Sequence, residues 1–105
     1  MKNGHSKFYE LLDLMAKTHS EKNSDYAIKD DPLSNLRASE RFGIAGYRGN
    51  AVRMADKWER FCNLLTKEPN VKGETIKDTL MDLAVYSLLE IILIEEYEQN
   101  NTNAK

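Results

Sequence analysis

The sequence predicts an all-α protein, a four-helix bundle whose last helix is the most apolar. Three observations support this fold class. Hydrophobic residues recur at helical spacing in four segments, no segment has a convincing strand pattern, and breaker residues separate the segments. We therefore expect a single helical domain over residues 1–105, with its core at about 7–98 and a polar tail at 99–105.

The first expected helix covers residues 7–22, because apolar residues recur there at helical spacing and poor helix formers follow. The second covers residues 32–42. Asp31 is a suitable capping residue before it, and Pro32 suits the first helical position. Gly43 is expected to end this helix, because glycine is the usual residue just past a helix end.

The third expected helix covers residues 51–67, with Asn50 as its N-terminal cap. Breaker residues then interrupt the chain, and the fourth helix is expected at 74–98. The third helix has an apolar face that predicts a buried side. Its members are Ala51, Met54, Ala55, Trp58, Phe61, Cys62 and Leu65.

The fourth helix is hydrophobic nearly all round its circumference. From Leu80 to Ile94 only Asp82, Ser87 and Glu90 are not apolar. Such a helix is normally buried on all sides. Three short partners would leave part of it uncovered, so we expect the chain to oligomerise through this helix as a homodimer or tetramer. The alternative is that the first and third helices cover it.

Composition excludes several classes of protein. A net charge of −2 argues against a partner that is a nucleic-acid polymer. The single cysteine and two distant histidines form neither a disulfide nor a zinc pattern. The apolar run is shorter than the ~20 residues of a membrane span, and the chain does not begin with a signal-peptide pattern. We expect a cytoplasmic protein with no membrane partner.

Three acids at four-residue spacing precede and enter the apolar run: Glu74, Asp78 and Asp82. Residues four apart lie on one face of a helix, and this face continues into apolar positions. Asp82 therefore falls where the core is expected. A buried carboxylate must be protonated, paired with a cation or bound to a metal, because an isolated charge is very costly to bury.

Charged residues also cover one side of the expected third helix. Alone, they are typical of a solvated face with intrahelical ion pairs. If the third and fourth helices form an antiparallel hairpin, however, carboxylates from both would converge into an oxygen-rich site that suits Mg²⁺. The candidate metal ligands are Asp56, Glu59, Glu74, Asp78 and Asp82. The adjacent basic residues, which suit phosphates, are Arg53, Lys57 and Arg60.

The acidic pairs resemble the all-α nucleoside triphosphate pyrophosphohydrolases of the MazG type. That family has an E-x-x-E motif on one helix and an E-x-x-D motif on a later one. Here Asp56-Lys-Trp-Glu59 corresponds to the first motif, and Asp78-Thr-Leu-Met-Asp82 to the second. Two departures exist, because Asp replaces the first Glu and the second pair is spaced by four residues.

A closer resemblance is to the nucleotide modification associated domain 1 family of phage genomes, and it covers about residues 8–95. The matching segments are His19-Ser-Glu-Lys22-Asn23-Ser-Asp25-Tyr26-Ala27, Asn35, Arg53-Met-Ala-Asp56-Lys57-Trp-Glu-Arg60, and Glu74 through Tyr86. The resemblance makes Lys22, Asn23, Asp25, Tyr26 and Asn35 candidate nucleotide-binding residues. Without it, the segment from Lys22 to Tyr26 would be taken as a polar helix end with local side-chain bonds.

These resemblances imply an oligomer that binds a nucleotide with Mg²⁺. For MazG relatives they imply hydrolysis of a nucleoside triphosphate to a monophosphate and pyrophosphate, here with Asp56, Glu59, Asp78 and Asp82 as catalytic carboxylates and a metal-activated water. Two alternatives stay open. One is a non-catalytic protein that sequesters or senses a nucleotide. The other is a helical oligomer whose carboxylates pair internally with Arg or Lys.

Overall fold

A computed structural model describes residues 3–26, 33–67 and 75–103 of the chain. Its regular structure is helical, and the described residues contain no strand, which confirms the all-α prediction. None of the helices in these ranges is both long enough and apolar enough to cross a membrane. The chain divides into two compact units, Met1–Asn35 and Leu36–Lys105, and each is described by itself.

The first unit contains helix α1, Ser6–Tyr26. The expected end near Lys22 is wrong, because the helix continues for about one more turn. Weak helix formers cost only up to ~0.7 kcal/mol each, so a few of them do not stop a helix. Phe8 and Tyr9 meet edge to face with ring centroids 5.6 Å apart, and Phe8 is still 56% exposed.

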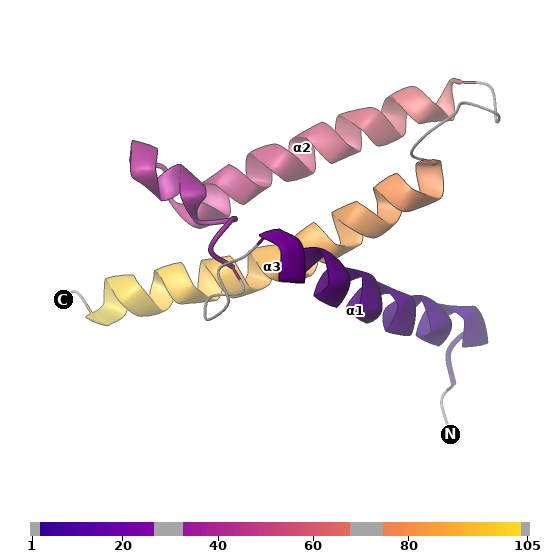
Figure 1. The fold of residues 1–105 in the computed structure, drawn as a ribbon, viewed down its shortest axis with the longest axis horizontal. Helices are drawn as coiled ribbons and strands as arrows, with labels where there is room; N and C mark the ends of the chain where they lie inside the picture. Colours follow the sequence, from indigo (N-terminus) through magenta and orange to yellow (C-terminus); the bar gives the residue numbers. More distant parts are fainter. Residues whose placement is uncertain (1–2, 27–32, 68–74, 104–105) are drawn as a thin grey trace. The chain divides into compact units, whose positions relative to one another are not determined.

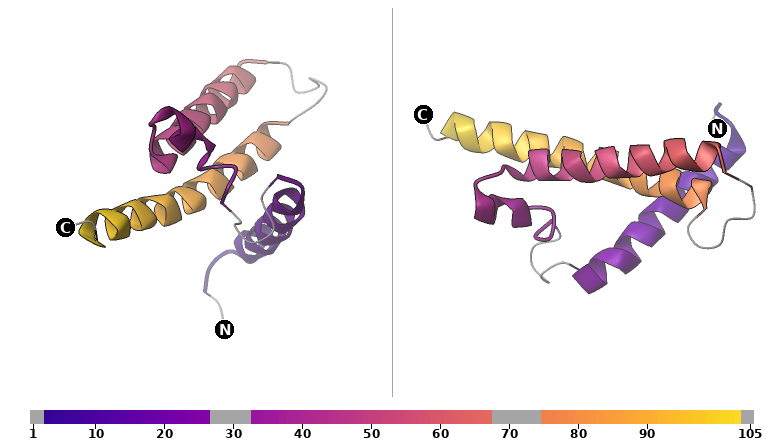
Figure 2. Two further views of the ribbon diagram at one scale, coloured as in Figure 1. Left: turned by 60° about the vertical axis from the view of Figure 1, so that its left-hand side comes forward. Right: turned by 90° about the horizontal axis from the view of Figure 1, so that it is seen from above.

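The second unit consists of a short 3₁₀ helix η1, Ala38–Phe42, followed by α2, Gly46–Leu65, and α3, Ile76–Asn103. Helices α2 and α3 run antiparallel and pack along each other as a hairpin (Figures 1 and 2). The predicted polar tail after Glu98 is helical as far as Asn103. No glycine or proline follows Glu98, so nothing in the sequence forces an earlier end.

The second expected α-helix is replaced by turns at 33–37 and the 3₁₀ helix η1, so the described chain has three α-helices rather than four. The backbone bonds here close over three residues, as in Glu40 N–H to Arg37 O (2.9 Å) and Gly43 N–H to Glu40 O (3.1 Å). Gly43 has φ of 77° and ends η1. Its predicted role as a stop is therefore confirmed.

Helix α2 begins at Gly46, so the prediction that Asn50 caps it is wrong. Asn50 lies inside the helix and is fully buried. The 3₁₀ helix η1 lies against the first turns of α2, and Gly49 allows its close approach. A Cβ added to Gly49 would clash with the Ser39 hydroxyl and lie 2.7 Å from the Ser39 Cβ.

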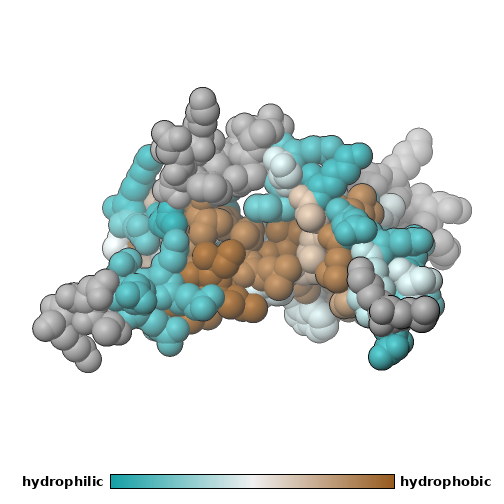
Figure 3. Space-filling model, turned by 90° about the horizontal axis from the view of Figure 1, so that it is seen from below, coloured by the Kyte–Doolittle hydropathy of each residue, from teal (hydrophilic) through white to brown (hydrophobic). Residues whose placement is uncertain are grey.

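Few apolar side chains are buried in the described part of the second unit, residues 36–67 and 75–101. Leu36 and Leu93 are buried hydrophobic residues, whereas Trp58, predicted to lie in the core, is 54% exposed. Hydrophobic side chains reach the surface over a wide area of the face drawn in Figure 3. The large exposed hydrophobic residues of α2 and α3 include Val52, Leu65, Leu80, Leu88, Ile91 and Ile92. The α2–α3 hairpin alone therefore does not bury the apolar surface of α3.

Candidate functional site

An ion pair joins the two helices that carry the acidic motifs. The Lys57 ammonium on α2 donates to Asp82 Oδ2 on α3 at 2.9 Å. The two side chains are 25% and 19% exposed, respectively. Asp82 is therefore paired with a cation, one of the three states that its position in an apolar helix requires.

A second polar contact lies further along the hairpin. The Asn50 amide nitrogen donates to Glu90 Oε1 at 3.1 Å and to the Tyr86 carbonyl oxygen at 3.2 Å. It also lies 3.8 Å from the Met54 sulfur. Glu90 is half-buried, so the amide supplies a donor to a carboxylate that is partly removed from water.

A third contact ties the segment before η1 to the C-terminal half of α3. Both Glu96 carboxylate oxygens accept from the Arg37 guanidinium, at 2.8 and 2.9 Å. Both bonds come from the same nitrogen, Nη2, and they are short because donor and acceptor are both charged. Asp82, Glu90 and Glu96 thus each bind a donor from the segments that precede α3.

Asp78 has a structural partner at the start of α3. The Thr75 N–H donates to Asp78 Oδ2 at 3.2 Å, and the Asp78 N–H donates to Thr75 Oγ1 at 3.1 Å. This reciprocal pair satisfies two backbone donors at the helix N-terminus, where a negative side chain is also favourable. The Asp78 side chain is exposed.

The acidic pair of α2 does not turn toward α3. Asp56 and Glu59 are exposed, whereas Lys57 faces Asp82. Successive helical residues are rotated by ~100°, so a helix that points Lys57 at α3 turns Asp56 and Glu59 elsewhere. No three His, Cys, Asp or Glu side chains gather at a possible metal site in the described residues, which exclude Glu74. The magnesium site stays a prediction.

The other predicted site residues lie in both units. Of the basic stripe on α2, Arg53 is half-buried and Arg60 is exposed, and both make interactions within the chain. Lys22 is exposed near the end of α1, and Asn35 is half-buried. The side chains of Asn23, Asp25 and Tyr26 lie outside the described residues. The nucleotide-binding roles given to these residues stay predictions.

Several residues of the polar contacts were not selected from the sequence: Arg37, Asn50, Glu90 and Glu96. One feature of the sequence does indicate these contacts, namely the spacing of polar residues on the two helices. Asp82 and Glu90 are eight residues apart and interrupt an apolar run on the same side of α3, while Asn50 and Lys57 are seven apart on α2. Matching polar positions on two antiparallel helices indicate polar contacts between them.

Comparison of the chain with protein-family models, with curated proteins and with solved structures finds no match. The likeness to MazG-type enzymes therefore depends on the motif residues alone.

We predict that Lys57→Met and Asp82→Asn each lower the free energy of unfolding by about 1 kcal/mol, because each leaves a partly buried charge without its partner. The double variant should lose less than the sum of the two single losses. Urea unfolding of the four proteins measures this coupling, with the exposed Lys67→Met as a control that should change little. Additive losses would show that the ion pair contributes nothing.

Proposed function

We propose that the chain is a Mg²⁺-dependent nucleotide pyrophosphohydrolase that works as an oligomer in the cytoplasm. One observation carries the proposal. The Lys57–Asp82 pair spans the two helices that hold the resembling motifs, and both side chains remain partly open to solvent. Its two charges are of the kinds that a phosphate and a divalent cation bind.

The residues at this pair are compatible with magnesium. Mg²⁺ is commonly held by one or two carboxylates, with substrate phosphates and water completing its shell. Asp82 supplies one carboxylate, and the exposed Asp56, Glu59 and Asp78 belong to the same hairpin. When bound, the ion would neutralise phosphate charge and lower the pKa of a water molecule for attack.

The two residues of the ion pair could exchange partners when a nucleotide and a cation bind. In the free protein Lys57 and Asp82 neutralise each other at 2.9 Å. In the proposed complex Lys57 turns to a phosphate oxygen and Asp82 faces the cation, so neither charge is left unpaired. Arg53 and Arg60, which lie on the Lys57 side of α2, would add phosphate contacts of the two-bond type.

A second candidate is a non-catalytic protein that binds a nucleotide. Two observations favour it. Asp78 is engaged at the start of α3, and the described carboxylates do not gather into a metal site. In this case the basic residues of α2 hold the phosphates, and no bond of the nucleotide is broken.

Two measurements test these proposals. The protein is incubated with Mg²⁺ and each ordinary or modified nucleoside triphosphate, and pyrophosphate release is measured. Its melting temperature is followed with nucleotide, with and without a chelator. We expect release that Asp82→Asn and Lys57→Met abolish and Lys67→Met retains. Stabilisation without release would support the second candidate. If neither release nor stabilisation occurs, both are wrong and the carboxylates serve internal pairing in a helical oligomer.

A further inference from the structure

The side of α3 that faces away from α2 carries a regular pattern. Its residues are spaced alternately by four and three positions: Lys77, Met81, Ala84, Leu88, Ile91 and Glu95. This is the spacing of the contact face in a coiled coil, and we call it the outer face. Tyr86 and Glu90 contact α2. At ~100° per residue, Tyr86 lies on the opposite side of the helix from Lys77.

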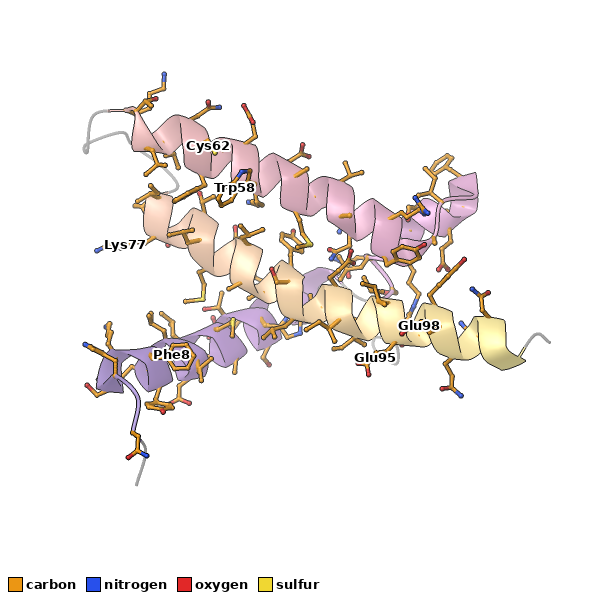
Figure 4. All side chains as sticks on the ribbon, turned by 180° about the vertical axis from the view of Figure 1, so that it is seen from behind. Phe8, Trp58, Cys62, Lys77, Glu95 and Glu98 are labelled. Atoms are coloured by element: carbon orange, nitrogen blue, oxygen red, sulfur yellow. The ribbon has the colours of Figure 1, made fainter. Side chains whose placement is uncertain are left out.

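The outer face is apolar in its middle and charged at its two ends. Leu88 and Ile91 are 50% and 55% exposed, although they lie at the centre of a hydrophobic run. Lys77 lies in the first turn of α3, whereas Glu95 lies well along the helix, eight residues before its last residue, with Glu98 about one turn beyond Glu95 (Figure 4). The two ends of the outer face therefore carry opposite charges.

If the outer face packs against α3 of a second copy of the chain, this charge distribution favours one relative orientation of the two helices. A parallel copy would set Lys77 against Lys77 and Glu95 against Glu95, and like charges opposite one another are unfavourable. An antiparallel copy sets Lys77 of one chain against Glu95 of the other, at both ends of the contact.

The spacing of these residues also fits two antiparallel α3 helices related by a two-fold axis at the level of Tyr86. Lys77 and Glu95 are each nine residues from Tyr86, Met81 and Ile91 each five, and Ala84 and Leu88 each two. With a two-fold axis at the level of Tyr86, each residue of the outer face meets its partner in the other chain: Lys77 meets Glu95, Met81 meets Ile91, and Ala84 meets Leu88. Lys77 and Glu95 would each lie about 13.5 Å along the helix from the two-fold axis, at ~1.5 Å per residue.

Neighbouring alignments are worse. If one helix moves along the other by seven residues, Glu95 of one chain meets Ala84 of the other. A move of seven residues in the opposite direction brings Lys77 against Leu88. Either alignment therefore buries a charged side chain against an apolar one. We propose that the outer face binds the same face of a second copy of the chain, antiparallel, with Lys77–Glu95 ion pairs at both ends. The inference rests on the oligomer in the proposed function and is independent of the nucleotide chemistry.

Charge reversal tests the pairing, with the dimer dissociation constant measured by analytical ultracentrifugation without nucleotide. Lys77→Glu and Glu95→Lys should each weaken the dimer about tenfold, since each places like charges at both ends. The combined variant should restore most of the affinity. Lys67→Glu is the control. Lys67 is exposed and lies just after the end of α2, so this substitution should leave the dimer unchanged. A monomeric protein, or a combined variant no tighter than the single ones, would overturn the proposal.

Disulfide formation tests the orientation. In a Cys62→Ser background, which removes the native free thiol, Met81→Cys and Ile91→Cys chains are oxidised separately and as a mixture. We expect linked dimers in the mixture only, because residue 81 of one chain meets residue 91 of the other. Linking of either variant with itself indicates a parallel pair and refutes the proposal, as does a mixture that stays unlinked.

Neither experiment depends on turnover. Cross-linked dimers without pyrophosphate release would overturn the proposed hydrolysis alone, and release by a monomer would overturn this interface alone.

Discussion

Asn50→Asp is expected to lower the free energy of unfolding by about 3 kcal/mol, because it buries a second carboxylate against Glu90. Asn50 is 0% exposed, and its amide nitrogen donates to both Glu90 Oε1 and the Tyr86 carbonyl. Aspartate removes the donor and adds a negative charge in the same place. Urea unfolding followed by circular dichroism measures the loss.

Two further variants separate charge from packing. Asn50→Ala removes the hydrogen bonds without adding a charge, and should lose about 1–2 kcal/mol. Asn50→Asp combined with Glu90→Gln should recover much of the loss, because the glutamine amide can donate to the new carboxylate. An Asn50→Asp protein as stable as the parent would contradict the contact between Asn50 and Glu90.

Gly49→Ala is expected to destabilise the protein by about 2 kcal/mol, although Gly→Ala inside a helix usually gains ~1 kcal/mol. The reason is steric. The new Cβ would lie 2.7 Å from the Ser39 Cβ. Ser39 cannot move away freely, because its hydroxyl donates to the Ile44 carbonyl at 3.0 Å. Thermal and urea unfolding both report the change.

The matched control is Gly46→Ala, one turn earlier in the same helix. The nearest atoms to its added Cβ are 3.5 Å away, an ordinary contact, so this variant should be neutral or more stable. Gly49→Ala combined with Ser39→Gly should return toward the parental stability. If Gly49→Ala alone is stabilising, η1 does not lie against α2 in the way described.

The long helices were predictable because their signals are local. The apolar run that predicts the fourth helix lies within α3, and Gly43 marks an end through its own backbone conformation. The segment after Pro32 was not predictable in the same way. Capping and proline signals favour an α-helix there, but the described part forms turns and a short 3₁₀ helix.

The candidate site shows a different limit. The sequence shows that Asp82 needs a partner, yet it does not determine which face of the neighbouring helix meets it. A rotation of α2 by ~100° exchanges Lys57 for its neighbour Asp56, and only the packing of the hairpin determines this rotation. Asn50 was misassigned for a related reason, since an asparagine suits both a helix cap and a buried amide contact.

The contacts of Arg37, Asn50 and Lys57 with α3 have a consequence for folding. If α2 slipped along α3 by one turn, about 5.4 Å, the contacts of Asn50 with Glu90 and of Lys57 with Asp82 would break together. Leucine and isoleucine faces alone would tolerate such a slip. We infer that these polar contacts select one alignment of the two helices from several that the apolar residues would leave nearly equal in energy.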